Sequence, residues 1–407
     1  MKNLPYLLVL LILISSCILL PSVILTQIPG PTPQPTSAPI DLPTVIIAPI
    51  VTTAPLPPAQ FRLVAYYPYW ILSTRQYRVE DIPVKFLTMI NYAFAVISDQ
   101  GECVSASASA DATNFPALRA LKASYPHLQT LISVGGGGNS QQFSQAAASD
   151  ASRARLVQSC VTFMQANGFD GIDLDWEYPQ AGETDLFTAL LNGLRQQLDA
   201  LAQTDGRRYL LTVAAPAGPW QMARIDFARI TPLLDWYNLM TYDYYGSWSS
   251  STGFNAPLYP GAADPQHLSM DTTVQAYLSA GVPAGKLVVG LPFYGRGWQG
   301  VTGNNHGLYQ PFSAPAQGTG EGSFDYYYIQ ENLLGKFGRY WDDEAKSPWL
   351  FDPAQGIMVS YDDAESLGLK AAYIRQHALG GGMIWQIGGD DDKGTLLKAV
   401  VEGLEQK

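Results

Sequence analysis

Eight short apolar stretches recur along the chain, and segments with helical spacing of apolar residues separate them. Strands that alternate with helices build a parallel sheet, and eight such units close into a (β/α)8 TIM barrel of the α/β class. After the fourth stretch, leucines from Leu190 to Leu201 recur at helical spacing, which predicts a helix that covers the barrel. The predicted strands are 63–67, 87–94, 130–134, 171–176, 209–214, 236–241, 287–292 and 382–386.

Four acids stand among apolar residues in the fourth stretch, at 169–179. Asp173, Asp175 and Glu177 alternate with apolar residues, and this period of two directs all three side chains to one face of a strand. Carboxylates packed this closely cannot all ionise, so at least one keeps a proton near neutral pH and is a candidate general acid. In a parallel barrel, Glu177 then lies near the C-terminal end of its strand, where active sites are built.

Two other interpretations of these acids are a calcium loop and a solvated strand edge. A calcium loop has glycine and small polar residues between its ligands, whereas Ile172, Leu174 and Trp176 stand between these acids. The four histidines are scattered without the spacing of metal ligands. We therefore predict no metal site and no cofactor.

The acid stretch also matches a known signature. Asp170, Asp173, Asp175 and Glu177 resemble the pattern D-x-x-D-x-D-x-E of glycoside hydrolase family 18, the chitinases and their relatives. The ends of other predicted strands resemble further motifs of this family, in the family's order. These are Tyr66, Tyr92-Ala93-Phe94-Ala95, Ser133-Val134-Gly135-Gly136, Met240-Thr241-Tyr242-Asp243, Gly290-Leu291-Pro292-Phe293-Tyr294-Gly295-Arg296 and Trp385.

The resemblance implies hydrolysis with retention of configuration, in which the sugar's own 2-acetamido group attacks the anomeric carbon and gives an oxazolinium ion. It implies that Glu177 is the general acid and base, and that Asp175 orients the acetamido group. Asp173 would share a proton with Asp175, and Tyr242 would donate a hydrogen bond to the attacking oxygen. The substrate-binding residues it implies are Tyr66, Phe94, Ser133, Gly136, Asp170, Tyr178, Met240, Asp243, Trp248, Tyr294, Arg296 and Trp385.

The segment 297–370, between the seventh and eighth predicted strands, is far longer than a strand-to-helix connection needs. It resembles the small α+β insertion of one branch of the family, which deepens the cleft into a groove, within a catalytic region of 61–407. One departure concerns Gly137, because family members often carry an aromatic residue directly after S-x-G-G. Trp248 matches another aromatic on the leaving-group side, so we expect weakened binding there and doubt tight, processive action on crystalline chitin.

The first 25 residues form an apolar run with Lys2 as the only charge, long enough for a signal peptide or a spanning helix. Ile14-Ser15-Ser16-Cys17 resembles a bacterial lipobox, which would lipidate Cys17. An uncleaved membrane anchor and a plain cleaved signal are the alternatives. Residues 26–60 are rich in proline and threonine and predict an extended linker. We expect an exported protein, extracellular or on the cell surface.

The formal net charge of −11 argues against nucleic acid and anionic membrane surfaces as partners, whereas a neutral polymer is compatible with it. Cys160 shares a helical apolar face with Leu156, Val157 and Met164, which favours core packing, and a Cys103–Cys160 disulfide is the alternative.

Taken with the resemblance, the sequence predicts a hydrolase that cleaves β-1,4 linkages next to N-acetylglucosamine in chitin or chitooligosaccharides. The same chemistry on peptidoglycan fragments or N-glycans is a second hypothesis. A chitin-binding lectin is a third, but lectins of this family usually lack the glutamate that Glu177 supplies here.

Overall fold

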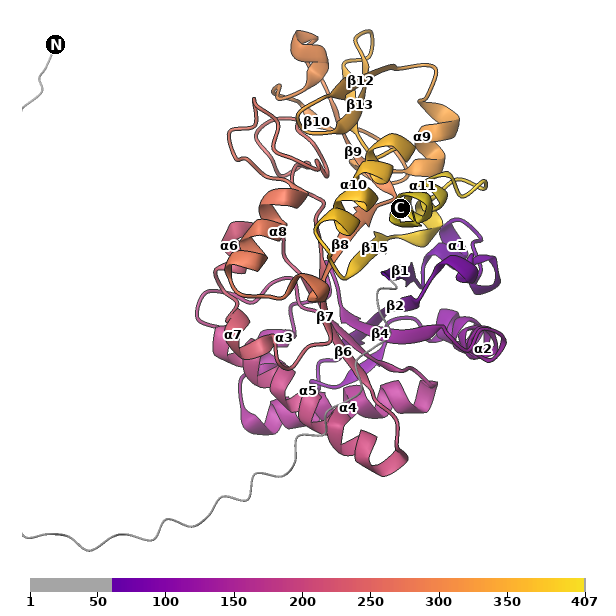
Figure 1. The fold of residues 1–407 in the computed structure, drawn as a ribbon, viewed down its shortest axis with the longest axis vertical. Coiled ribbons are helices and arrows are strands. Elements are labelled where there is room, and N and C mark those ends of the chain that lie inside the picture. The colour runs from indigo at the N-terminus through magenta and orange to yellow at the C-terminus, as the bar shows by residue number, and fades with distance from the viewer. Residues whose placement is uncertain (1–60, 406–407) are drawn as a thin grey trace, which may run out of the picture. The chain divides into compact units, whose positions relative to one another are not determined.

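The structure is a computed structural model, and it describes residues 61–405. Eight parallel strands pair in the order β1-β15-β8-β7-β6-β5-β4-β2, and pairing of β2 with β1 closes the barrel (Figure 1). The predicted (β/α)8 barrel is thereby confirmed. Its strands are β1 (Arg62–Pro68), β2 (Met89–Ile97), β4 (Gln129–Gly135), β5 (Gly171–Asp175), β6 (Leu210–Ala215), β7 (Trp236–Leu239), β8 (Leu287–Pro292) and β15 (Gly381–Trp385). A short strand, β3 (Cys103–Ser105), runs antiparallel to β2.

Helices surround the barrel strands in Figure 1, and the strands are buried on both faces as a result. On α5, the leucines that predicted a covering helix do face the core, with Leu190, Leu194 and Leu198 fully buried. The longer helices are α2 (Ala108–Ser124), α4 (Asp150–Asn167), α5 (Thr184–Asp205), α8 (Met270–Ser279), α10 (Ala364–Gln376) and α11 (Thr395–Glu405). The shorter ones are α1 (Ile71–Thr74), α3 (Phe143–Ala147), α6 (Pro219–Met222) and α7 (Phe227–Ile230).

A second, antiparallel sheet lies in the chain between β8 and β15, as the predicted α+β insertion required. Its order is β10-β9-β14-β13-β12, and β11 pairs with β9. The elements are β9 (Tyr294–Gln299), β10 (Ala314–Pro315), β11 (Ser323–Asp325), α9 (Tyr326–Asn332), β12 (Gly338–Asp342), β13 (Ser347–Asp352) and β14 (Ile357–Ser360). Because β9 begins two residues after β8 ends, the second sheet starts at the rim of the barrel.

One strand end differs from its prediction in a way that matters for the site. β7 ends at Leu239, whereas the apolar pattern predicted a strand to Thr241. The backbone turns there, because Thr241 N–H donates to Leu239 O and Tyr242 N–H donates to Met240 O, which are the contacts of tight turns at strand ends. Met240, Tyr242 and Asp243 therefore lie on a loop past the strand.

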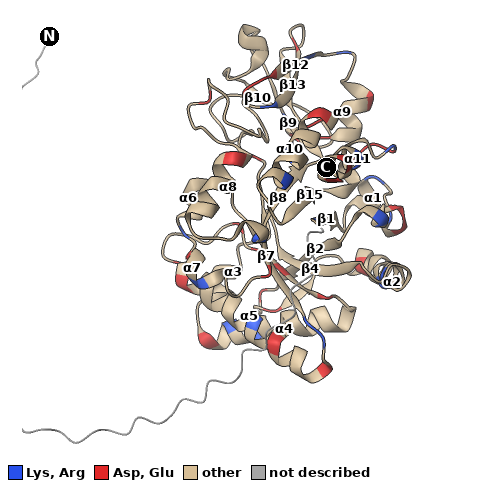
Figure 2. Ribbon diagram, viewed as in Figure 1, with Lys and Arg blue, Asp and Glu red and all other residues tan. Residues whose placement is uncertain are grey.

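Cys103 and Cys160 are buried free thiols, so Cys160 packs in the core as predicted and no disulfide joins the pair. The predicted signal or anchor, Cys17 and the linker lie outside the described residues. Within residues 61–405, no helix has the length and apolar character needed to cross a bilayer. Acidic residues are scattered over helices and loops in the view of Figure 2.

Candidate active site

The deepest acid of the site is Asp173, which lies on β5 inside the barrel and is fully buried. Its carboxylate accepts four hydrogen bonds from side chains on four other strands of the barrel, β1, β4, β6 and β7. The donors are Tyr66 (2.7 Å), Ser133 (2.8 Å), Thr212 (2.6 Å) and Asn238 (3.1 Å). Burial raises the pKa of Asp173, and these four donors act against that rise because they stabilise the charged form. Asp173 is therefore a carboxylate whose position is set from all sides.

Asp175 follows on the same face of β5, and its side chain is buried but poorly paired. Its Oδ1 has no hydrogen-bond partner within residues 61–405. Burial, followed by the charges of Glu177 and Asp173, raises the pKa of Asp175 well above its ordinary range. Because a buried polar atom without a partner is costly, this oxygen is a candidate acceptor for a bound ligand.

Glu177 lies two residues past the end of β5, and it lines a pocket of about 290 Å³ together with Asp175. Burial and the negative charge of Asp243 raise the pKa of Glu177 to about 7, while hydrogen bonds from the Tyr178 side chain and from Gly137 N–H oppose the rise. A carboxyl group with this pKa holds or gives up its proton near neutral pH, as a general acid and base must.

Aromatic side chains build the pocket wall around Trp385, at the end of β15. The ring centroid of Trp385 lies 5.4 Å from that of Tyr66, 5.9 Å from that of Phe94 and 6.4 Å from that of Trp70. Phe94 in turn packs on Gly136, where an added Cβ would come within 2.5 Å of the ring and where φ is +89°. Only glycine suits that conformation and approach. The wall is thus a set of flat apolar faces, which suit the apolar face of a pyranose.

Tyr242 faces the pocket from the loop after β7, and Met240 lines the pocket beside it. The only hydrogen bond of the Tyr242 hydroxyl within the described residues is a weak one to the sulfur of Met383, at 3.9 Å. Burial raises the pKa of Tyr242 well above its ordinary value, so the hydroxyl keeps its proton. It is therefore a hydrogen-bond donor that a ligand can use.

Asp243, next in the chain, is held by two residues of β9. Tyr294 donates its hydroxyl hydrogen to Asp243 at 2.6 Å, and Arg296 forms a bidentate pair with the same carboxylate, with both contacts at 2.7 Å. The first strand of the second sheet thus shapes the barrel's pocket directly, and Arg296 also lines it.

The structure does not bring Asp170 into the pocket, although the motif grouped it with the other acids. Asp170 precedes β5 and lies at the opposite end of the strand from Glu177. It pairs with Lys122 and Arg207, each at 2.6 Å, and accepts a hydrogen bond from Thr130 N–H at 2.8 Å. These contacts correct the predicted contact with substrate, because they tie Asp170 to the base of the barrel.

A second hollow of about 370 Å³ continues from the pocket, since Tyr178, Met240, Tyr242 and Asp243 line both. Two tryptophans lie in this groove with much of their surface in solvent, Trp220 with 61% exposed and Trp248 with 60%. The resemblance pointed to Trp248 but not to Trp220, which lies on the short helix α6.

Sequence reasoning also missed residues that support the site. Trp70 lines the pocket, and Thr212 and Asn238 hold Asp173. A signal for the last two was present, because each is a polar residue inside an otherwise apolar strand that the barrel buries on both faces. Gly137, noted as a departure from the family pattern, also lines the pocket.

Together these groups can protonate a leaving oxygen and bind a flat, polar ring. Comparisons with known proteins show the family of the chain. The model of Glycosyl hydrolases family 18 matches residues 62–390. Chitinase A1 of Niallia circulans is 37% identical over 86% of this chain, which spans 60% of that protein's length. Chitinase B of Serratia marcescens is 37% identical over 78% of this chain and 76% of its own.

Among solved structures, the Group IV chitinase of Ostrinia furnacalis in complex with allosamidin is similar, with a TM-score of 0.78 and 31% identity. The match covers 85% of this chain and 99% of that one.

Proposed function

Because the chain belongs to glycosyl hydrolases family 18, we propose that it hydrolyses β-1,4 linkages next to N-acetylglucosamine in chitin or chitooligosaccharides. One observation carries the proposal: Glu177, with a pKa of about 7, stands beside Asp175, whose Oδ1 lacks a partner within residues 61–405. Glu177 supplies a proton, and Oδ1 of Asp175 can accept a hydrogen bond from a donor such as the N–H of an acetamido group.

In the first step, Glu177 gives its proton to the glycosidic oxygen as the bond to the anomeric carbon breaks. The acetamido carbonyl oxygen of the same sugar attacks that carbon and closes an oxazolinium ring, so no enzyme carboxylate becomes attached to the sugar. This fits the pocket, because Asp243, which also lines it, is bound by Tyr294 and Arg296. Water then attacks the anomeric carbon, Glu177 takes back a proton, and configuration is retained.

Asp175 and Tyr242 hold the acetamido group during this step. The unpaired oxygen of Asp175 accepts the N–H, and the Tyr242 hydroxyl donates to the attacking oxygen. Asp173 shares a proton with Asp175. Because four donors satisfy the Asp173 carboxylate, the resting proton lies on Asp175, which turns toward Glu177 during the cycle.

The aromatic wall around Trp385 receives the sugar whose bond is cleaved. The groove with Trp220 and Trp248 receives the units on the leaving-group side. Gly137 leaves no side chain to stack there, so these two tryptophans provide the flat surfaces for longer substrates.

We further propose that the enzyme is exported and tethered at the cell surface through residues 1–25, with 26–60 as the spacer. Membrane fractionation of the full chain and of Cys17→Ser, with labelled fatty acid, tests this. Label on the wild type but not on the variant supports lipidation, and export without label supports an anchor or a cleaved signal.

The experiment that tests the activity is hydrolysis of chitohexaose by the full chain and by Glu177→Gln, with product lengths and anomers resolved at early times. Rapid release of short products in the β form, lost in the variant, is the expected result. Cleavage that persists in Glu177→Gln overturns the assigned role of Glu177. Absence of cleavage by the wild type, with binding kept, redirects the substrate to peptidoglycan or N-glycans.

A further inference from the structure

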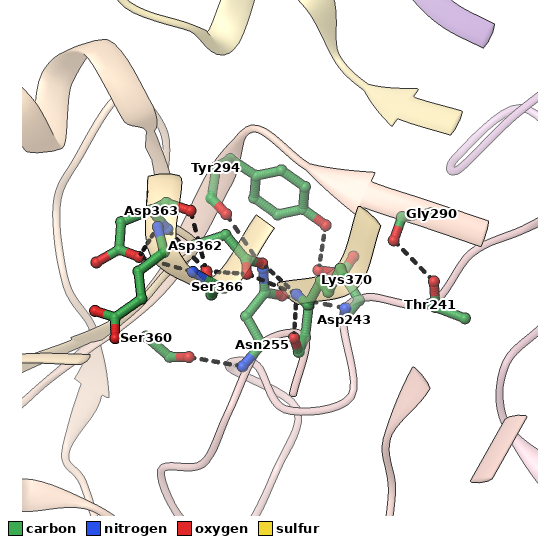
Figure 3. A network of polar contacts seen from close by, with 12 residues as sticks. Thr241, Asp243, Asn255, Gly290, Tyr294, Ser360, Asp362, Asp363, Ser366 and Lys370 are labelled. Atoms are coloured by element: carbon green, nitrogen blue, oxygen red, sulfur yellow. Dashed lines mark hydrogen bonds and ion pairs between the residues drawn. The ribbon is translucent and has the colours of Figure 1, made fainter. Parts of the chain in front are cut away.

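Asn255 joins three segments of the chain next to Asp243, a residue that lines the pocket (Figure 3). The residue is buried, with 1% of its surface exposed. Its Oδ1 accepts a hydrogen bond from Asp243 N–H at 3.1 Å, and its Nδ2 donates to Tyr294 O at 3.2 Å. Its backbone N–H donates to Ser360 Oγ at 2.8 Å, and its backbone carbonyl accepts from Tyr244 N–H at 3.1 Å. Two consecutive amides of the pocket loop are therefore held by this one residue.

Asp243 has a conformation that needs such support. Its φ is +59°, in the left-handed region that residues other than glycine seldom adopt. A conformation of this kind persists when the surrounding contacts determine it. Here β9 holds the carboxylate of Asp243 through Tyr294 and Arg296, and Asn255 holds its backbone.

A buried ion pair anchors the segment that carries Asn255. Lys370 on α10 is fully buried, and its Nζ lies 2.6 and 2.7 Å from the two carboxylate oxygens of Asp362. The same Nζ donates to the backbone carbonyl of Ala256, the residue after Asn255. Ser366 donates to Asp362 at 2.7 Å. Separating a buried charge from its partner is energetically costly. The Lys370–Asp362 pair therefore holds the backbone at Ala256 in place.

We propose that Asn255, anchored through Ala256 by the Lys370–Asp362 pair, is a positioning residue that sets the orientation of Asp243. Through Asn255, the second sheet and α10 determine the position of the Asp243 carboxylate, and with it the position of Arg296, in the sugar pocket. The proposal deepens the proposed function and rests on it for its kinetic consequence.

The consequence for catalysis follows from what Asp243 does to Glu177. The negative charge of Asp243 is a cause of the raised pKa of Glu177, after burial itself. The titratable groups that interact with Glu177 in the structure are Asp175, Tyr178, Tyr242 and Asp243. When Asp243 moves away, the pKa of Glu177 falls, and the acid form is lost at lower pH.

The test compares Asn255→Ala with Asn114→Ala as a matched control. Asn114 is equally buried at 1% exposed, but it lies on α2 and donates to the Tyr92 hydroxyl, away from the pocket. We expect Asn255→Ala to lower kcat/KM for chitohexaose about tenfold or more, since small misplacements in a site are costly, and to move the alkaline limb of the kcat profile to lower pH. The control is expected to lose similar thermal stability and keep both kinetic properties.

Amide hydrogen exchange at Asp243 and Tyr244 gives a readout that needs no activity. The Asp243 amide, which loses its acceptor, is expected to exchange faster in Asn255→Ala, while the Tyr244 amide keeps the backbone carbonyl of residue 255 as its acceptor and serves as an internal reference. Both amides are expected to exchange at the wild-type rate in the control. If Asn255→Ala does not fold, Ser360→Ala removes the acceptor for Asn255 N–H and so loosens the residue that holds the Asp243 amide, which is expected to exchange faster. Unchanged exchange, or unchanged kinetics and pH profile, overturns the proposal. Failure of the wild type to cleave chitohexaose is a failure of the proposed function instead, and exchange still tests the positioning.

Discussion

Asp173 and Asp175 point the same way from β5, yet their carboxylates have opposite surroundings. Asp173 accepts four hydrogen bonds, whereas Oδ1 of Asp175 has no partner within residues 61–405. The first is fixed by the barrel, and the second is left for a ligand. Neutralising each carboxylate should therefore have different effects on stability.

Asp173→Asn is expected to destabilise the protein by about 1–3 kcal/mol, because the new amide cannot accept all four hydrogen bonds and leaves buried donors unpaired. Urea unfolding at pH 7 measures this. A free energy of unfolding equal to that of the wild type would show that the four donors do not depend on the charge.

Asp175→Asn is expected to keep or raise stability. The pKa of Asp175 is raised in the folded state, so ionising it costs stability as pH rises, and the variant removes that cost. Its kcat should still fall by about 10²-fold or more, because the neutral amide can accept the acetamido N–H but carries no negative charge to stabilise the positive charge that develops in the transition state. Urea unfolding at pH 8 and early-time kinetics on chitohexaose test both parts, and strong destabilisation would contradict the first.

Glu177 should make hydrolysis fall as pH rises through about 7, since the acid form is the one that acts. The free energy of unfolding should also fall as pH rises. Because the pKa of Glu177 is higher in the folded state than in the unfolded state, the wild type loses stability as pH rises from the ordinary glutamate pKa to about 7. Above that range, Glu177→Gln is expected to be more stable than the wild type by about 1–2 kcal/mol, a value reduced for partial exposure. Thermal unfolding from pH 5 to 9 checks this, and curves that stay parallel would refute it.

Trp220→Ala and Trp248→Ala are each expected to raise KM for chitohexaose by about 2- to 10-fold, because each removes a stacking surface worth about 0.5–1.5 kcal/mol. Shorter substrates that do not reach the groove should be unaffected. Tyr125→Ala is the control, because Tyr125 is 38% exposed but packs edge-on against His127, outside both hollows. Equal effects on short and long substrates would place the two tryptophans outside the binding path.

Lys370→Met is expected to lower the free energy of unfolding by about 3–5 kcal/mol, because it leaves Asp362 buried without its counter-ion. The exposed Arg78–Glu80 pair is the matched control, and Arg78→Met should leave the urea midpoint nearly unchanged. A small effect of Lys370→Met would mean that Asp362 takes up a proton or is hydrated by water once its counter-ion is gone, and would contradict the prediction.

Local periodicity was enough to predict the barrel and its acid array. The period of two from Asp173 to Glu177 holds wherever the strand lies, because alternate side chains of any strand share a face. The same kind of argument located all eight barrel strands, although β7 ends earlier than its apolar pattern, where tight turns interrupt it. Sequence periodicity thus determined the fold and the face that carries the acids, and the family resemblance pointed to Glu177 among them as the candidate acid.

Beyond the residues that the family motifs named, only the tertiary structure decided which groups surround those acids. Asp170 belongs to the same motif but pairs with Lys122 and Arg207 at the far end of the strand. Asn255 and Trp220, which no local pattern singles out, lie beside the pocket because distant segments meet there. The physical reason is that hydrogen bonding, burial and the resulting pKa values depend on neighbours in space, and closure of the barrel and its second sheet selects those neighbours.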